Sequence, residues 1–138
     1  MWLEQDYISR FWGNIQEWID EITDNIESDW VRYFIIEHNN EPIGFLQYYE
    51  TNNAPQGDWS SEPIGTVGID YLIGNRNYIG KGYGSKIVRL LVNLIKSKNE
   101  YDYIIADPTK ENLASIKTLK NNGFYLSENG LYKLDLNI

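Results

Sequence analysis

Three glycines at alternate positions, Gly80, Gly82 and Gly84, constrain the fold of this chain more than any other feature. They follow an apolar, β-branched run over residues 66–74 and open an apolar helical pattern over residues 83–99. A glycine-rich turn between a strand and a helix directs backbone N–H groups and the positive end of the helix toward one point. The sequence therefore predicts an anion site at this turn. The alternative is that the glycines only make a tight connection.

Two common phosphate-binding motifs do not fit this stretch. A P-loop needs G-x-x-x-x-G-K-[ST], but five residues separate Gly74 from Gly80, and Lys81 is followed by Gly82. A dinucleotide fingerprint needs a third glycine where this chain has Ser85. These departures exclude the usual ATPase and dinucleotide interpretations.

The rest of the chain alternates between helical and strand patterns. The predicted elements are helices over 3–12 and 14–26, strands over 31–38, 42–50 and 66–74, a helix over 83–99, a strand over 101–108, a helix over 112–121 and a hairpin over 124–136. We expect the two later helices to bury these residues: Ile87, Leu90, Leu91, Leu94, Ile95, Leu113, Ala114, Ile116 and Leu119. The order predicts one domain over 1–138 of the mixed α/β (α+β) class, with a central mixed sheet flanked by helices.

Charge is distributed unevenly along the chain, although the net charge is only −8. Residues 1–75 carry 14 acids against Arg10 and Arg32, whereas residues 76–138 carry 10 basic residues against 6 acids. Much of this charge serves solubility. The asymmetry also favours an anion held by the C-terminal half and a cation held by the N-terminal half. It argues against a nucleic-acid partner, which needs a concentrated basic face.

Several other classes of site are excluded by composition. The chain has no cysteine, so disulfides, thiolate metal sites and a cysteine nucleophile are ruled out. His38 is the only histidine, which argues against a metal cluster or a serine–histidine triad. The sequence shows neither a run of ~20 apolar residues nor a signal-peptide pattern. We therefore expect a cytoplasmic protein that binds no metal and does not associate with a membrane.

Two acidic residues stand close to the glycine turn in the predicted sheet. Asp70 interrupts the apolar run 66–74, a position where strands seldom carry a carboxylate. Asp107 ends the strand over 101–108, just before Pro108. Each has a simpler interpretation, Asp70 as a solvated carboxylate and Asp107 as a turn former. Perturbed acids beside a cleft are nevertheless candidates for acid–base chemistry or cation binding.

The glycine turn resembles motif A of the GNAT superfamily of acyl-CoA N-acyltransferases. The motif [QR]-x-x-G-x-[GA] corresponds to residues 77–82, with Asn77 in place of the usual Gln or Arg. Residues 42–124 resemble the aminoglycoside 6′-N-acetyltransferase branch through EPIGFLQYYE, GIDYLIG, GKGYGSKIVRLLV and ADPTKENLASIKTLKNNGF. The G-[IM]-D at Gly68–Asp70 and the D-P at Asp107–Pro108 are features of that branch. The resemblance covers about three fifths of the chain.

The resemblance implies a GNAT fold, acetyl-CoA as cosubstrate, and acetyl transfer to an aminoglycoside with Asp70 as base. The implied CoA-binding residues are Tyr71, Leu72, Ile73, Asn77, Ile79, Gly80, Lys81, Gly82, Tyr83, Gly84, Ser85 and Asn112. Acceptor binding is expected from Asp70, Asp107, Tyr48, Glu50, Asp58 and Trp59, with Glu62 as a further candidate. Asn112 has an equally good interpretation as a residue that bonds locally at a helix start.

The chain departs from the family pattern in two places. The helix dipeptide Cys-Tyr, whose tyrosine is the presumed proton donor to the leaving thiolate, is Thr118-Leu119 here. The CoA thiolate is then protonated by water or by another tyrosine, or it leaves without a proton donor. The family segment W-L…F-W-G stands at Trp2-Leu3 and Phe11–Gly13, so the first strand of the fold is expected to be missing. The exposed sheet edge could pair with a second copy in a homodimer.

Three functions stay open at this level. The first is acetylation of an aminoglycoside, and the second is acetylation of another amine, such as a polyamine, a peptide N-terminus or a siderophore precursor. The third is a CoA-binding module without catalysis. The acidic N-terminal half favours a polycationic acceptor.

Overall fold

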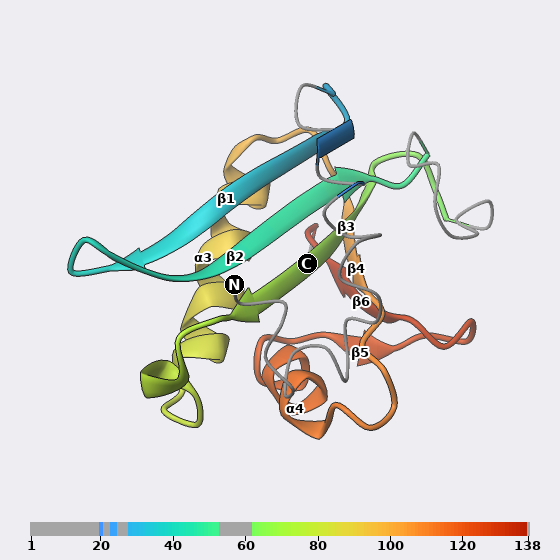
Figure 1. Ribbon diagram of the computed structural model, residues 1–138. Coiled ribbons are helices and arrows are strands. Elements are labelled where there is room, and N and C mark those ends of the chain that lie inside the picture. Colours follow the sequence, from blue (N-terminus) through green and yellow to red (C-terminus); the bar gives the residue numbers. More distant parts are fainter. Residues whose placement is uncertain (1–19, 21–22, 25–27, 53–61, 138) are drawn as a thin grey trace.

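Six strands form one mixed sheet in the order β1-β2-β3-β4-β6-β5 (Figure 1). The computed structural model describes residues 20, 23–24, 28–52 and 62–137, so the helices expected over 3–12 and 14–26 lie almost entirely outside it. Among the strands of the described residues, only β3 and β4 pair in parallel. The strands are β1 (Val31–His38), β2 (Glu41–Glu50), β3 (Thr66–Ile73), β4 (Tyr103–Ala106), β5 (Tyr125–Leu126) and β6 (Tyr132–Asp135). The predicted mixed sheet is confirmed.

The β1–β2 hairpin has a shorter turn than the sequence suggested. Asn39 and Asn40 both have positive φ, 51° and 66°, as in the two-residue turns that match the twist of paired strands. Strand β2 therefore begins at Glu41, and Pro42 lies inside it opposite Glu37. Proline is tolerated there because the ladder with β3 starts only at Gly44.

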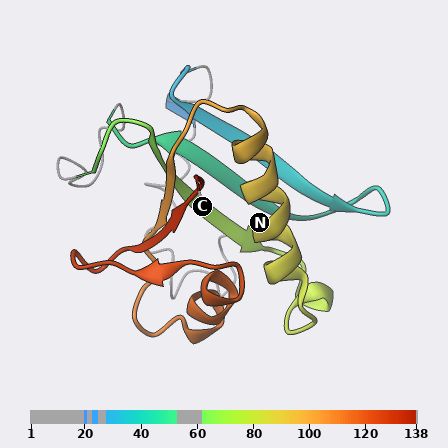
Figure 2. The same cartoon turned by 180° about the vertical axis from the view of Figure 1, so that it is seen from behind.

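Strands β3 and β4 pair over a short length and then separate. Their ladder joins Thr66–Gly68 to Tyr103–Ile105, whereas β3 continues to Ile73. Seen from front and back, the two strands diverge toward α4 (Leu113–Asn121), which lies below the opening (Figures 1 and 2). The end of β3 nearest the glycine turn is therefore separated from its parallel neighbour.

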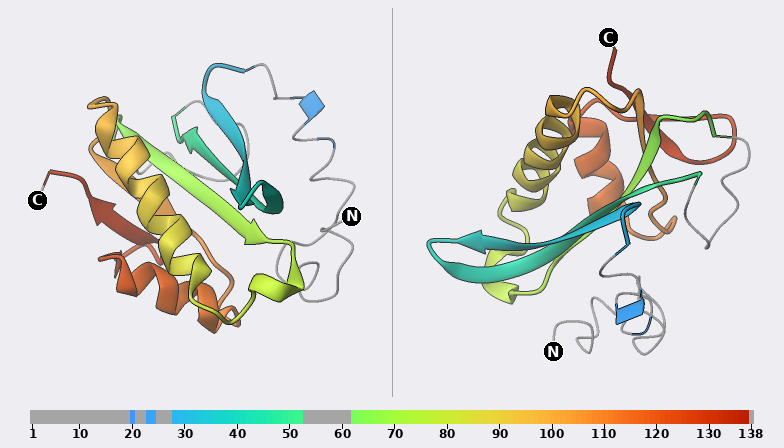
Figure 3. Two further views of the ribbon diagram at one scale, coloured as in Figure 1. Left: turned by 90° about the vertical axis from the view of Figure 1, so that its left-hand side faces the viewer. Right: turned by 90° about the horizontal axis from the view of Figure 1, so that it is seen from above.

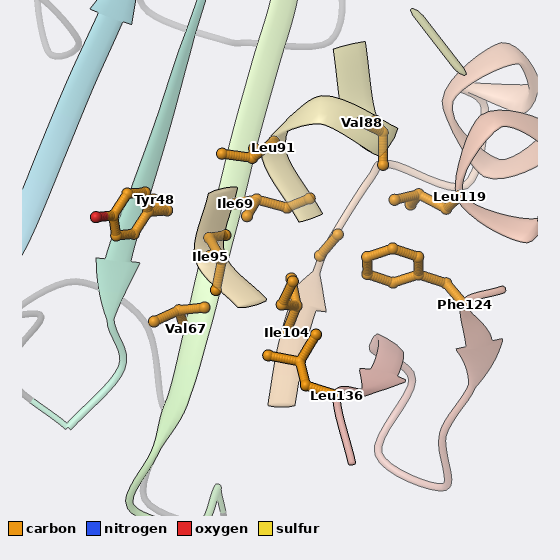
Figure 4. Close-up of a cluster of buried hydrophobic side chains, with 11 residues drawn as sticks. Tyr48, Val67, Ile69, Val88, Leu91, Ile95, Ile104, Leu119, Phe124 and Leu136 are labelled. Atoms are coloured by element: carbon orange, nitrogen blue, oxygen red, sulfur yellow. The ribbon is translucent and has the colours of Figure 1, made fainter. Parts of the chain in front are cut away.

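Helices α3 (Tyr83–Ser97) and α4 lie on the same side of the sheet, as the view from above shows (Figure 3). Both pack on a single apolar core between them and the sheet (Figure 4). The core consists of Tyr48, Val67, Ile69, Val88, Leu91, Ile95, Ile104, Ala106, Leu119, Phe124 and Leu136. Along the described part of the chain, no helix is both long and apolar enough to cross a membrane.

The buried faces of the two helices are narrower than expected. Leu90 and Leu94 are 69% and 37% exposed, because α3 buries the neighbouring stripe Ile87, Val88, Leu91 and Ile95. On α4, Leu113 and Ala114 are exposed and only Leu119 is fully buried. When the apolar residues of a helix cover a wider arc than the sheet can contact, the sequence does not determine which side of that arc is buried.

Candidate functional site

The glycine turn has an open, left-handed backbone. Gly80 and Gly82 have φ of 73° and 82°, and a Cβ at either position would meet no atom within 4 Å. Glycine is therefore needed for conformation and not for space. Gly82 precedes α3 without capping it through a side chain, and the first helical turn has no acidic residue. The N–H groups at this helix start are well placed for an anion.

Gly84 and Ser85 contact α4 instead. A Cβ at Gly84 would lie 3.5 Å from Thr118 Oγ1, so α3 approaches α4 closely there. Asn122, at the end of α4, donates its Nδ2 group to Ser85 O and Ser85 Oγ, each at 3.2 Å, and to Thr118 O at 3.0 Å. The start of α3 is thus anchored to the end of α4.

The other flank of the glycine turn is braced by the β1–β2 hairpin. The rings of His38, Tyr78 and Tyr83 meet edge to face with centroids 5.0 to 5.4 Å apart. Tyr78 Oη donates to Glu41 Oε2 at 3.3 Å and lies 3.2 Å from His38 Nδ1. Asn77, in the short 3-10 turn η2 (Arg76–Tyr78), donates its backbone N–H to Asn75 Oδ1 at 3.0 Å. Lys81 and Ile79 are exposed beside this cluster.

Asp70 is held by a buried glutamine that the sequence did not single out. Gln47, directly opposite on β2, donates its Nε2 group to Asp70 Oδ2 at 2.8 Å. Gln47 is 4% exposed, so its amide has a fixed orientation. A buried side-chain amide beside a strand carboxylate orients that carboxylate. The only sequence signal for Gln47 is a polar residue in an otherwise apolar strand.

Tyr49 lies beside this pair, on the same face of the sheet. Its partner across the ladder is Gly68, and a Cβ at Gly68 would overlap the Tyr49 ring. The glycine that precedes Ile69 and Asp70 is therefore required for close approach of an aromatic ring. Tyr49 was also missed, because the sequence does not show which of two adjacent tyrosines faces Asp70.

Tyr48 and Glu50 occupy the opposite face, under the helices. Tyr48 is 4% exposed and belongs to the core. Glu50 accepts a hydrogen bond from Tyr101 Oη at 3.1 Å, and burial together with this carboxylate raises the pKa of Tyr101. Side chains alternate along a strand, so the structure separates these two predicted acceptor residues from Asp70.

The remaining predicted acids have different surroundings. Asp107 follows Ala106, the last residue of β4, and burial raises the pKa of its carboxyl above the usual range. Glu62 forms an ion pair with Lys133 at 3.4 Å, and only 3% of its side chain is exposed. Asp58 and Trp59 lie outside the described residues. Within the described segments, no group of His, Asp or Glu side chains could hold a metal ion.

Two residues link the end of β3 and the start of α4. Tyr71 Oη, on β3, lies 2.8 Å from Ser115 Oγ, on α4. Asn112 caps α4, its Oδ1 accepting from Ser115 N at 3.2 Å. This contact is the local hydrogen bond at a helix start that the sequence suggested as one of two roles for Asn112. Leu72 is buried and Ile73 half-buried, so β3 keeps its packing up to the turn.

Comparison with known proteins identifies the family of this fold. The family described as "Acetyltransferase (GNAT) domain" matches residues 1–130. The curated aminoglycoside N(6′)-acetyltransferase type 1 of Klebsiella pneumoniae is 33% identical over 133 residues, which are 89% of this chain and 65% of that relative. The chain thus spans slightly less than two thirds of the length of this curated relative.

Solved structures agree with this assignment. The aminoglycoside acetyltransferase AAC(6′)-Ib in complex with coenzyme A has a TM-score of 0.82 and 30% identity, covering 97% of this chain and 85% of that one. The same enzyme with coenzyme A and kanamycin has a TM-score of 0.82 at 29% identity, with the same coverage. The chain therefore belongs to the GNAT acetyltransferase family and groups there with the aminoglycoside 6′-N-acetyltransferases.

Proposed function

We propose that this protein transfers the acetyl group of acetyl-CoA to an amino group of a polycationic small molecule, most directly the 6′-amine of an aminoglycoside. One observation carries the proposal: the strand that bears Asp70 runs along the β3–β4 opening and leads, through η2, to the glycine turn. A donor bound at the turn and along β3 would bring its thioester to the carboxylate. The similar enzyme that was solved with coenzyme A and kanamycin supports both ligands.

The donor site combines the glycine turn and the end of β3. The pyrophosphate of CoA would bind the backbone N–H groups of residues 80–85, with the positive end of α3 behind them. The pantetheine arm would run beside residues 71–73, where β4 no longer pairs with β3. Asn112 is already engaged as a helix cap through its side-chain oxygen. Any contact of Asn112 with CoA would therefore use the other side of its amide.

The acceptor would react at Asp70. A protonated amine must lose a proton before its nitrogen can attack a thioester carbonyl, and Asp70 would hold the ammonium and accept that proton, directly or through water. Gln47 keeps the carboxylate in one orientation. A backbone N–H near Tyr71 or Leu72 would stabilise the tetrahedral oxyanion. The attack would be direct, with no covalent enzyme intermediate.

Further ammonium groups of the acceptor need further acids. Asp107 is exposed at the end of β4 and suits this role, because a bound ammonium would lower the pKa that partial burial now raises. Tyr49, half-buried beside Asp70, offers a ring face to a sugar or a cation.

A homodimer, a single domain over 1–138 and a cytoplasmic location stay predictions.

A panel of amines separates the three candidate functions. Thiol release from acetyl-CoA would be followed with kanamycin, spermidine, a peptide with a free N-terminus and a hydroxylamine. We expect the highest kcat/KM with kanamycin. Preference for another amine would favour the second function. Binding of CoA by calorimetry without turnover of any amine would favour a non-catalytic module.

Replacing Asp70 tests its role as the base. We expect Asp70→Asn to lower kcat/KM for kanamycin by about 10²-fold or more, because general bases contribute about 10² to 10⁴. The variant keeps an oxygen for Gln47, so the Kd for CoA should stay within about twofold. Glu128→Gln, an exposed acid in the β5–β6 turn, is the matched control. A rate within a few-fold of wild type would show that Asp70 is not the base.

A further inference from the structure

The proposed reaction leaves one proton without a source. When the carbon–sulfur bond of the thioester breaks, its electron pair stays on sulfur, and a buried thiolate is costly unless it is protonated or hydrogen-bonded. Along β3, the residue after the proposed base is Tyr71. Because adjacent strand side chains point to opposite faces, Asp70 and Tyr71 flank the same stretch of strand from two sides.

The Tyr71 side chain stands on the stretch of β3 along which the proposed donor would bind. Its ring packs against the core beyond the end of the β3–β4 ladder, and its hydroxyl reaches Ser115 on α4, with 2.8 Å between the two oxygens. Ser115 is one turn before Leu119, which is fully buried and offers no polar atom. Among the described residues on this wall of the opening, Tyr71 and Ser115 thus form a hydroxyl pair bridging strand and helix.

Burial keeps this phenol protonated. Desolvation raises the pKa of Tyr71, and the hydrogen bond with Ser115 offsets only part of that rise. Asp70 lies on the other face of β3. Helices α3 and α4 carry four charged residues close in sequence to Ser115 or to the start of α3. All four are exposed: Lys86, Arg89, Lys117 and Lys120. Around neutral pH the phenol of Tyr71 is therefore a neutral donor.

We propose that Tyr71 is a catalytic residue of the proposed acetyl transfer, donating its Oη proton to the CoA sulfur as the thioester breaks. The amine nitrogen forms a bond to the carbonyl carbon, the carbon–sulfur bond breaks, and sulfur takes the electron pair and the phenol proton. The nitrogen gives up its second proton to water as the amide forms, and Ser115 Oγ returns a proton to Tyr71 and takes one from that water. The first proton, held by Asp70, is released to solvent. Overall, an ammonium and acetyl-CoA give an amide, CoA thiol and one proton released to solvent.

Removing the hydroxyl alone tests this role. In the full chain, with acetyl-CoA and kanamycin as substrates, we expect Tyr71→Phe to lower kcat by about 10- to 100-fold. The KM for acetyl-CoA should stay within about twofold. Wild-type kcat should fall at alkaline pH as Tyr71 loses its proton, and this fall should be absent in Tyr71→Phe. Ser115→Ala should lower kcat less, because the phenol remains.

A fluorinated tyrosine at position 71 separates catalysis from packing. Its more acidic phenol should move the alkaline fall of kcat to lower pH, which a purely structural hydroxyl would not do. Tyr125→Phe, on the exposed strand β5, is the control and should be unchanged. An active wild type with unaltered kcat and pH profile in Tyr71→Phe would overturn this inference alone. A wild type that turns over no amine would overturn the proposed function and the inference together.

Discussion

At Gly68 the sheet has no room for a side chain, because the Tyr49 ring lies where a Cβ would stand. The residue opposite Asp70 is Gln47, so glutamine, tyrosine and glycine together build the surface around the carboxylate. Each of these residues is ordinary in isolation. Their cross-strand positions make them a site.

This close approach gives a test by double mutation. We expect Gly68→Ala to lower the free energy of unfolding by about 1–3 kcal/mol, the usual range for overpacking. In a Tyr49→Ala background the same change should cost much less, because the obstructing ring is gone. Urea unfolding of the four proteins measures both effects. Additive losses would contradict the close approach of Tyr49 to Gly68.

For single residues, the backbone conformation could be predicted from the sequence, but the face of the sheet to which each side chain points could not. Positive φ at Gly80 and Gly82 follows from a dense glycine turn before a helix. Which side chains of β2 face Asp70 could not be read, because QYYE has no polar–apolar alternation. Tyr48 and Glu50 were accordingly predicted for the acceptor site, and the structure places them under the helices.

Helices α3 and α4 are joined at the glycine turn through one amide. Asn122 bonds to the backbone and side chain of Ser85 and to Thr118 in its own helix. This joint holds the first turn of α3, whose N–H groups the proposed donor would use. The stability of the joint should therefore affect binding as well as folding.

Replacing this asparagine tests the joint. We expect Asn122→Ala to lower the free energy of unfolding by about 1–3 kcal/mol, since half-buried acceptors lose their donor. The Kd for CoA should rise several-fold because the helix start is less firmly held. The neighbouring Asn121→Ala, exposed on α4, should change both quantities little. Urea unfolding and calorimetry measure the two effects, and unchanged CoA binding in a destabilised Asn122→Ala would separate the joint from the donor site.

Periodicity predicted every described strand and both described helices, with ends shifted by a few residues. It could not predict the contacts between elements. The decisive hydrogen bonds join residues 23 apart for Gln47 and Asp70, 37 apart for Ser85 and Asn122, and 44 apart for Tyr71 and Ser115. Such pairs depend on strand register and helix placement, which a local pattern does not contain.

Over the whole molecule, the distribution of charge and the order of the elements both favour a cationic acceptor and an anionic donor. The acidic N-terminal half includes β2 and Asp70, and the basic C-terminal half includes the glycine turn and α3. Two of these acids already have partners within the protein. Glu62 forms an ion pair with Lys133, and Glu50 accepts a hydrogen bond from Tyr101. The excess negative charge of the N-terminal half would still favour a polycation as acceptor, and the turn would attract the phosphates of CoA.

The most direct test of this account is the product formed from acetyl-CoA and kanamycin. Mass spectrometry and NMR should find kanamycin with one acetyl group on its 6′-amine, and one CoA thiol released for each amide formed. Asp70→Asn should form the same product far more slowly. Tight binding of CoA together with unmodified kanamycin would contradict the central claim that β3 brings a donor thioester and an acceptor amine together at Asp70.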